Sequence, residues 1–172
     1  NHEVPLALGV VPVGFAAANF ADPDGDGMLP WVSEKLEELG AEVPVLFDET
    51  DGIDFEAVAD TDPDVILAAY SGLTDEDYET LSAIAPTVAY PEAPWATAWR
   101  DMIRFNSAAI GMAPEGDELI ASIEAEIADT VAEYPQLEGR SAMFMTHIDL
   151  TDLSEIGFYT THDTRVQFFE DL

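Results

Sequence analysis

Short apolar runs alternate along this chain with stretches in which apolar residues recur every three or four positions. The runs are typical of β-strands, and the periodic stretches are typical of helices with one apolar face. The predicted strands are residues 10–15, 43–47, 65–70 and 87–90. The predicted helices are residues 31–39, 55–60, 75–85 and 97–110. This alternation predicts an α/β fold, with a mainly parallel sheet and flanking helices in a Rossmann-like three-layer lobe.

The third predicted strand and the helix after it have the clearest signals. Residues 65–70 (VILAAY) are apolar without interruption, as expected for a strand covered on both faces, and we predict a central place for them in the sheet. Thr74 is a suitable N-cap for the helix at residues 75–85. Asp77 stands at the third helical position, where its carboxylate can complete a variant of the capping box.

A longer helix is predicted at residues 114–134, where an apolar stripe recurs at spacings of four. The stripe consists of Leu119, Ile123, Ile127 and Val131. Roughly 20 residues at about 1.5 Å each span about 30 Å, close to the diameter of a small domain, so this helix could bridge two lobes. After it, residues 142–147 and 158–161 predict strands and residues 165–171 predict a helix. These elements begin a further α/β unit.

The charge balance of the chain is extreme. Asp and Glu number 36 against 5 Lys and Arg, which gives a formal net charge of −31. This charge argues against nucleic acid as a partner, and it discourages self-association at low salt, so we expect a monomer. Such an acidic excess is typical of proteins adapted to high salt or secreted into variable surroundings. The sequence has no Cys, and it has no apolar run of the roughly 20 residues that a membrane span needs.

Residues 22–27 (DPDGDG) match the start of a calcium-binding EF-hand loop. Asp22, Asp24 and Asp26 fall at the first, third and fifth ligand positions of such a loop. The twelfth position, where a bidentate Glu is required, holds Ser33 instead. The pattern therefore favours a solvated acidic turn, and no metal ligands are predicted, although cation binding by this loop stays an open alternative.

Aromatic and basic residues gather beyond the carboxyl ends of the predicted strands, where ligands bind in open parallel sheets. Tyr70 ends the third strand, and Trp95 and Arg100 follow the fourth. Arg104 lies one helical turn beyond Arg100, so two of the chain's five basic residues share one helix. Flat rings and a guanidinium suit a bulky, anionic or carbonyl-rich ligand. Ion pairing with a nearby carboxylate such as Asp101 is the alternative role for either arginine.

Catalytic and metal-binding patterns are incomplete. Ser71 lies at a strand-to-helix turn, as a nucleophile elbow would, but Ala69 and Leu73 occupy the places of that motif's glycines. The three histidines have no metal-ligand spacing; they are His2, His147 and His162. We therefore predict that the protein is not an enzyme and has no catalytic residues. A small α/β serine hydrolase using Ser71 is the alternative.

Several blocks of sequence follow one another in an order that is hard to assemble by chance. They are LALGVVPVGF, DFEAVADTDPDVIL, YSGLT, IAPTVAYP with a following W-x3-W-R, and RVQFFEDL. Together they resemble the iron-siderophore substrate-binding proteins of ABC transporters. The resemblance implies two α/β lobes around a cleft, joined by one long helix. It places an N-terminal lobe at residues 1–113, the connecting helix at 114–135, and the start of an incomplete C-terminal lobe at 136–172.

The resemblance also implies a ligand and the residues that hold it. In this class a ferric siderophore lies in the cleft between aromatic and Arg side chains. The matching candidates are Tyr70, Trp95 and Arg100, followed by the weaker candidates Trp31 and Arg104. Because the siderophore already completes the coordination shell of Fe³⁺, no intrinsic cofactor and no metal ligand from the protein are expected. Haem or cobalamin is the alternative cargo within the same class.

The partner and location follow from the same resemblance. Glu56 matches the place of a first-lobe glutamate that docks onto the permease of the ABC transporter. The implied location is the extracellular side of the cytoplasmic membrane or the periplasm. A lipid anchor outside this chain would be the only connection to the membrane.

Overall fold

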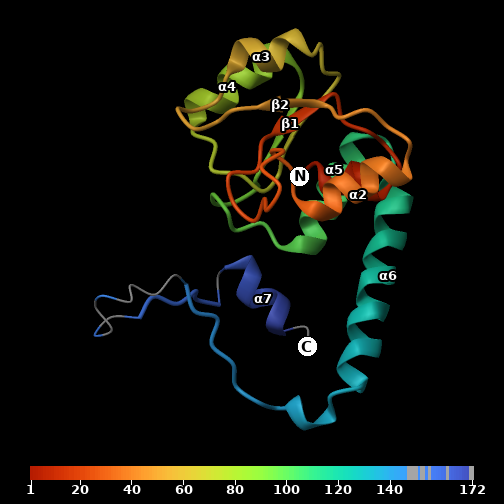
Figure 1. The fold of residues 1–172 in the computed structure, drawn as a ribbon, viewed down its shortest axis with the longest axis vertical. Helices are drawn as coiled ribbons and strands as arrows, with labels where there is room; N and C mark the ends of the chain where they lie inside the picture. Colours follow the sequence, from red (N-terminus) through yellow and green to blue (C-terminus); the bar gives the residue numbers. More distant parts are fainter. Residues whose placement is uncertain (147–150, 152–153, 155, 162, 171–172) are drawn as a thin grey trace.

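The computed structural model describes residues 1–172 except 147–150, 152–153, 155, 162 and 171–172. An α/β lobe carries one long helix, and a short helix lies opposite the lobe (Figure 1). The helices of the lobe are α1 (Glu3–Ala7), α2 (Pro30–Glu38), α3 (Phe55–Asp60), α4 (Asp75–Ile84) and α5 (Trp99–Ala109). Its strands are β1 (Gly14–Ala16), β2 (Val45–Phe47), β3 (Ile66–Ala68) and β4 (Thr87–Ala89). The long helix is α6 (Ala113–Ala132), followed by a 3₁₀ turn, η1 (Pro135–Leu137), and by α7 (Thr164–Glu170).

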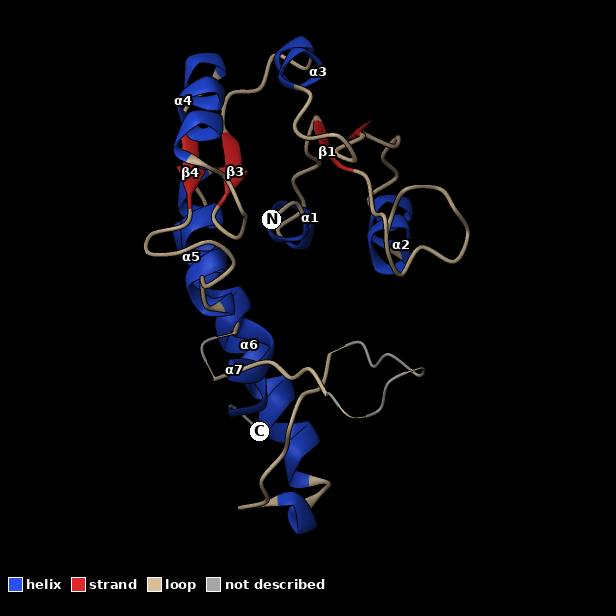
Figure 2. Cartoon of the chain, turned by 90° about the vertical axis from the view of Figure 1, so that its left-hand side faces the viewer, coloured by secondary structure: helices blue, strands red, loops and turns tan. Residues whose placement is uncertain are grey.

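The strands pair in parallel, which confirms the predicted α/β class. β1 pairs with β2 and β3 pairs with β4, and a helix lies in each connection, as a parallel crossover requires. The register places Phe15 opposite Leu46, and Leu67 opposite Val88. Figure 2 shows the β3–β4 pair and β1 on opposite sides of α1. The described strands therefore form two small sheets, not one continuous sheet.

The prediction of a central strand at residues 65–70 is wrong for the described part of the sheet, because β3 pairs with β4 alone. Just beyond β3, the side-chain amide of Asn1 forms hydrogen bonds with the backbone N–H and C=O of Tyr70, as a neighbouring strand would. The N–H of Tyr70 donates to Oδ1 of Asn1 at 3.1 Å, and Nδ2 of Asn1 donates to the carbonyl of Tyr70 at 2.9 Å. These two bonds hold the backbone of Tyr70 in place.

The first strand is also shorter than predicted, since β1 begins only at Gly14 and residues 10–13 lie outside it. The short helix α1, which the apolar pattern does not predict, ends directly before these residues, with Gly9 in the left-handed region at φ 81°. The N–H groups of Gly9 and Val10 donate back to carbonyls of this helix. Within residues 10–13, the carbonyl of Val13 accepts from the N–H of Val45 in β2 at 3.1 Å.

The α-helices other than α1 agree with the predictions to within two residues at each end. α4 begins with the complete predicted capping box. The Thr74 hydroxyl accepts from the Asp77 N–H at 3.2 Å, and the Asp77 carboxylate accepts from the Thr74 N–H at 2.9 Å. These hydrogen bonds from Thr74 hold the pKa of Asp77 below its ordinary value. α2 begins with Pro30 in its first turn, where a missing N–H costs nothing.

Buried apolar side chains form three clusters that tie the elements together. The first joins α1, β1 and α2 and contains Leu6, Phe15, Met28, Val32 and Leu36. The second joins α1, α5 and α6 and contains Val4, Ile103 and Ile120. The third lies between β3 and α4 and contains Ala68, Leu73 and Leu81.

The helices α5 and α6 approach each other closely at one glycine. A Cβ added at Gly116 would overlap with the side chain of Ser107, and both residues are buried. Beyond this point Ile120 is buried, whereas the later stripe residues Ile127 and Val131 are only half-buried. The first half of α6 is therefore anchored on the lobe, and the second half extends away from it (Figure 1).

The chain after α6 returns toward the lobe. In the described residues, the strands predicted at 142–147 and 158–161 are reduced to one antiparallel bridge between Met145 and Phe158, and His147 lies outside these residues. α7 then lies between the lobe and the far end of α6 (Figure 1). No helix within the described ranges is long and apolar enough to cross a membrane.

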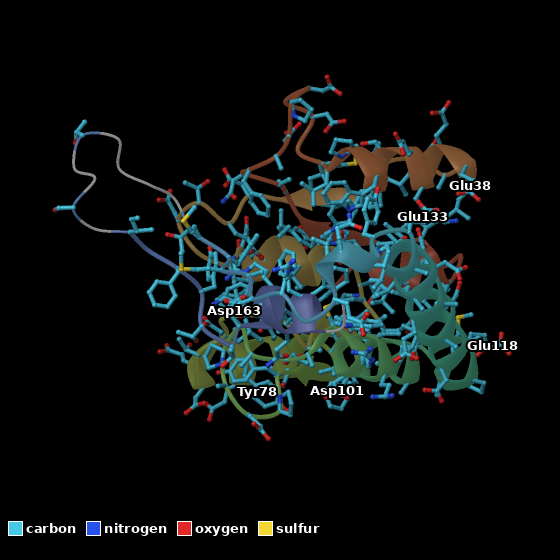
Figure 3. The ribbon with its side chains drawn as sticks, turned by 90° about the horizontal axis from the view of Figure 1, so that it is seen from below. Glu38, Tyr78, Asp101, Glu118, Glu133 and Asp163 are labelled. Atoms are coloured by element: carbon cyan, nitrogen blue, oxygen red, sulfur yellow. The ribbon has the colours of Figure 1, made fainter. Side chains whose placement is uncertain are left out.

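Many acidic side chains lie on exposed faces of the helices, as the labelled Glu38 and Glu118 illustrate (Figure 3). Ion pairs among the described residues include Lys35–Glu38, Arg100–Glu124, Arg104–Asp101, Arg104–Asp117 and Arg165–Asp163. Most of the 36 carboxylates therefore have no basic residue to balance them. Their mutual repulsion is reduced only by dissolved salt.

Candidate ligand site

The candidate site begins where β3 and β4 end, because the carboxyl ends of parallel neighbours lie at the same edge of a sheet. Tyr70 follows β3 and Trp95 follows β4, and the structure brings the two rings together. Their centroids lie 5.3 Å apart with an interplanar angle of 75°, an edge-to-face contact. Trp95 is 53% exposed, so a large part of its indole is available to a ligand.

The backbone around Trp95 is held in an unusual conformation. Trp95 has φ 60°, in the left-handed region that residues other than glycine rarely adopt. Its N–H donates to the carbonyl of Ser71 at 3.0 Å. Two residues further on, the buried Thr97 hydroxyl donates to the carbonyl of Ala69. The loop after β4 is thus fastened at two points to the loop after β3, which explains how the strain at Trp95 is maintained.

The hydroxyl of Tyr70 lies at the start of α7. Its oxygen accepts from Oγ1 of Thr164 at 3.4 Å. In the sequence, Tyr70 precedes the long helix α6 and Thr164 follows it. The sequence reasoning does not predict this contact. It shows that α7 approaches the edge of the lobe that carries the aromatic pair.

A basic and aromatic group accompanies this contact on the α7 side. The Arg165 guanidinium lies 3.8 Å from the ring centroid of Tyr159 and donates to its hydroxyl at 3.1 Å. It also forms two hydrogen bonds with Asp163, at 2.8 and 2.6 Å. These bonds lower the pKa of Asp163 and raise the already high pKa of Arg165. Sequence reasoning missed Tyr159 and Arg165, although Arg165 is one of five basic residues and begins the RVQFFEDL block.

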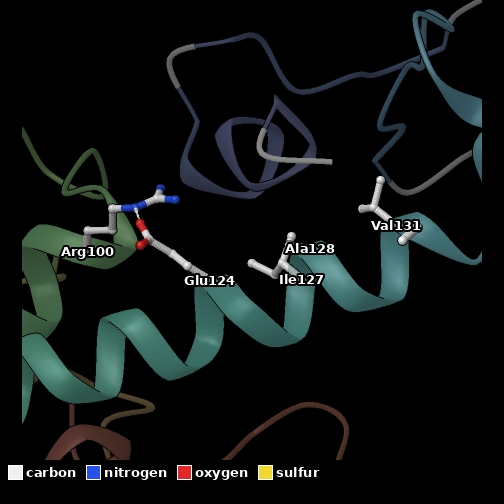
Figure 4. A pocket seen from close by; sticks show the side chains of 6 residues that line it. Arg100, Glu124, Ile127, Ala128 and Val131 are labelled. Carbon is white, nitrogen blue, oxygen red and sulfur yellow. Dashed lines mark hydrogen bonds and ion pairs between the residues drawn. The ribbon is translucent and has the colours of Figure 1, made fainter.

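Arg100 lies on α5 beside a hollow of about 510 Å³. Its Nε donates to Glu124 at 2.6 Å, and its guanidinium lies 4.3 Å from the ring centroid of Trp99. The residues that line the hollow are Arg100, Glu124, Ile127, Ala128, Val131 and Ala132. Figure 4 shows Arg100 on α5, and Glu124, Ile127, Ala128 and Val131 on the side of α6 that faces α7. The ion pair matches the alternative role weighed for the arginines, and convergence of Arg100 with Tyr70 and Trp95 stays a prediction.

The weaker candidates make other contacts. The indole N–H of Trp31 donates to the carboxylate of Glu3, the first residue of α1, at 2.7 Å. Arg104 pairs with Asp101 at 3.0 Å and approaches Asp117 at 3.7 Å, at the seam of α5 and α6. The described contacts of neither residue include the Tyr70–Trp95 pair, so their ligand-binding role stays a prediction.

Glu56, the predicted permease contact, is exposed in the first turn of α3. Figure 1 places α3 at the end of the lobe farthest from α7. A side chain there is accessible to a large partner, and the docking role itself stays a prediction.

The acidic loop that resembles an EF-hand is closed by its own backbone. The carboxylate of Asp22 accepts from the N–H groups of Gly25, Asp26 and Gly27, at 2.8, 3.3 and 2.8 Å. These bonds, the one from Gly27 above all, hold the pKa of Asp22 below its ordinary value. The described residues contain no group of three or more His, Asp or Glu side chains arranged to hold a metal ion.

The alternative nucleophile is also engaged locally. The Ser71 hydroxyl donates to the carbonyl of Ala68 at 2.8 Å and is half-buried. Neither His147 nor His162 lies within the described residues, and His2 is stacked on Phe15 with centroids 4.3 Å apart. Burial lowers the pKa of His2 to about 4, which keeps it neutral at ordinary pH. No described histidine is therefore placed to act as a base for Ser71.

Comparison with protein families gives one match, the periplasmic binding protein family, over residues 1–171. This chain belongs to the periplasmic binding protein family. Members of this family and the similar solved structures are binding proteins, and the family implies an extracytoplasmic location. A comparison with curated proteins found no match.

Several solved structures are similar to this periplasmic binding protein. PiaA of Streptococcus pneumoniae TIGR4, crystallised with ferrichrome, is 47% identical, with a TM-score of 0.91 over 99% of this chain and 57% of that one. A periplasmic solute-binding protein of Mycobacterium smegmatis is 31% identical, with a TM-score of 0.71 over 84% of this chain and 49% of that one. Staphylococcus aureus SirA, at 22% identity and a TM-score of 0.62, shares the fold. The chain thus spans about half the length of these relatives.

Proposed function

We propose that this chain is part of the extracytoplasmic substrate-binding component of an ABC importer, and that the complete protein binds a ferric siderophore between two lobes. Residues 1–113 would form the N-terminal lobe, residues 114–135 the connecting helix, and residues 136–172 the start of the C-terminal lobe. The similarity to PiaA, which was crystallised with ferrichrome, supports this class of cargo. The protein would be a carrier and not an enzyme.

The observation that carries the proposal is the edge-to-face contact of Tyr70 and Trp95, centroids 5.3 Å apart, at the edge of the lobe approached by α7. Across this edge lie Tyr159 and Arg165, which offer a second ring and a permanent positive charge. Such groups can stack on and hydrogen-bond to the organic shell of a chelate. Hydroxamate oxygens already fill the coordination sphere of Fe³⁺, so the protein needs no ligand set of its own.

Delivery to the membrane forms the second part of the proposal. Glu56, exposed on α3, would dock onto a basic residue of the permease. A lipid anchor outside this chain would keep the protein near the permease. Strong like charge, −31 in this chain, would keep the carrier monomeric at low salt.

Titration of the complete two-lobed protein with ferric siderophores tests this function. Ferric ferrichrome and a ferric tris-catecholate would be added in turn, and Trp fluorescence and calorimetric heat recorded. We expect saturable binding of a ferric siderophore and none of metal-free ferrichrome or ferric citrate. The absence of saturable binding across the whole panel would overturn the proposal. A Soret or corrinoid absorbance band in the protein purified from rich medium would instead identify haem or cobalamin as the cargo.

A further inference from the structure

The indole of Trp95 lies directly against a glycine. A Cβ added at Gly72 would lie 2.7 Å from Nε1 of Trp95 and 2.9 Å from both Cε2 and Cζ2. Real Cβ atoms essentially never approach other atoms so closely, so the two side chains could not coexist in this arrangement. Gly72 is not among the glycines with positive φ. Its backbone conformation is therefore open to other residues, and the indole is what requires glycine here.

Three consecutive residues form a seat for this indole. Tyr70 contacts it edge to face, the carbonyl of Ser71 accepts the Trp95 N–H, and Gly72 leaves the space that the ring fills. The left-handed backbone of Trp95 turns the side chain toward this seat. The remaining half of the indole is exposed.

We propose that Gly72 is a positioning residue for ligand binding, which acts by allowing Trp95 to lie flat against the loop after β3. This proposal rests on the proposed function, in which Trp95 contacts a ferric siderophore. Any residue with a Cβ at position 72 pushes the indole off its seat and into the space that the cargo occupies. The glycine therefore sets the orientation of the ring and the width of the aromatic half of the site.

Because Gly72 and Trp95 are both exposed, a substitution at Gly72 can change ligand binding without changing the stability of the fold. Gly72 is exposed and Trp95 is 53% exposed, so a displaced indole moves into solvent without opening a cavity in the core. An alanine at an ordinary φ also restricts the unfolded chain, which favours the folded state. The Gly72→Ala variant should thus fold with an unchanged melting temperature while its binding surface is altered.

A double-mutant cycle on the complete two-lobed protein tests the proposal, with ferric ferrichrome as the probe and calorimetry as the measurement. We expect Gly72→Ala to raise the Kd about tenfold when Trp95 is present, and by less than about twofold in a Trp95→Ala background. The second background is the matched control, because it adds the same methyl group where there is no indole to displace. Equal effects in the two backgrounds, or no effect in either, would overturn the positioning role.

A second measurement needs no ligand and keeps the two proposals distinguishable. In a variant in which Trp31, Trp99 and any tryptophan outside this chain are replaced by Phe, Trp95 is the only tryptophan left, and acrylamide quenching reports its exposure. Gly72→Ala should increase the quenching constant and shift the emission to longer wavelength. Unchanged quenching would refute the seat described here even if ferrichrome binds. If the wild-type protein binds no ferric siderophore, the proposed function fails, and the quenching result still decides the role of Gly72.

Discussion

Two loop regions carry candidate sites in the sequence, and they are built in opposite ways: one is the loop after β1, and the other is formed by the loops after β3 and β4. In the loop after β1, the carboxylate of Asp22 accepts three backbone N–H groups from its own turn. In the loops after β3 and β4, Tyr70 and Trp95 are in edge-to-face contact, and Trp95 stays 53% exposed. The first loop uses its polar atoms to close itself. The second leaves its ring surface available.

The difference shows why residue types alone do not define a site. Asp-rich turns and EF-hands share the same carboxylates, but a carboxylate bonded by backbone N–H groups has fewer lone pairs left for a cation. An edge-to-face contact covers only part of the ring surface of a pair, and the exposed 53% of Trp95 is available for stacking. A candidate site is thus recognised by the groups that the fold leaves without an internal partner.

The largest expected effect comes from removing the exposed ring. Trp95→Ala in the complete protein should weaken binding of ferric ferrichrome by about 2 kcal/mol, roughly 30-fold in Kd, as loss of a central aromatic contact does in other interfaces. Isothermal titration calorimetry measures this change.

Trp31→Ala provides a matched comparison, since Trp31 is 54% exposed, close to the value for Trp95, but donates to Glu3. We expect a clearly smaller loss of affinity for this variant. A larger loss for Trp31→Ala than for Trp95→Ala would move the ligand surface to α2 and reverse the comparison.

The acidic loop predicts a pH-dependent effect on stability. The pKa of Asp22 is held below its ordinary value of 3.8, chiefly by the N–H of Gly27. A lowered folded-state pKa stabilises the protein above the unfolded pKa, and this contribution is lost as the pH falls through the folded pKa. Asp22→Asn should therefore lower the melting temperature at about pH 6, and the difference from wild type should shrink when the pH is lowered to about 2.

The control for this experiment is Asp24→Asn, which removes the same charge from an exposed place in the same turn. Differential scanning calorimetry at both pH values should show little change for this control at about pH 6. If both variants lose stability equally, the effect comes from net charge and not from closure of the turn.

The sequence was sufficient to predict the features that depend on local pattern and strand direction. The capping box at Thr74 and Asp77 follows from residue type and spacing, and the meeting of Tyr70 with Trp95 follows from parallel neighbours sharing one edge. The approach of Arg165 could not be predicted in this way. It depends on the direction of α6, which is set where Gly116 packs on Ser107, far from Arg165 in the sequence.

The failures at β1 and β3 have a similar origin. The apolar residues 10–13 indicate a strand. However, the end of α1 at Gly9 takes up the N–H of Val10, which donates to the carbonyl of Pro5. The apolar run at 65–70 indicates that both faces of this strand are covered. It does not indicate which strands pair with its edges, and in the described sheet β3 pairs with β4 alone. Gly72 is a further example, because its need for space appears only when the indole of Trp95 is in place.

A smaller effect is expected at the serine beside the aromatic pair. Ser71→Ala removes one hydrogen bond, from the hydroxyl to the Ala68 carbonyl at 2.8 Å. Such a loss costs about 1 kcal/mol, or roughly 2–4 °C in melting temperature for a chain of this size. A fluorophosphonate probe should label neither form. Labelling of the wild type that disappears in Ser71→Ala would restore the hydrolase alternative.

The smallest expected effect is that of calcium on the acidic loop. We expect Ca²⁺ to change the melting temperature no more than its ionic strength does. With 36 acidic against 5 basic residues, any added cation screens the surface, so CaCl₂ and NaCl at equal ionic strength must be compared. Because the Asp22 carboxylate is already bonded by Gly25 and Gly27, Ca²⁺ should gain no specific ligand set there. The melting temperature of wild type and of Asp24→Ala should then rise equally with CaCl₂, and a chelator should lower neither. A calcium response that exceeds that of Asp24→Ala, and that a chelator reverses, would show that the turn opens to hold the ion.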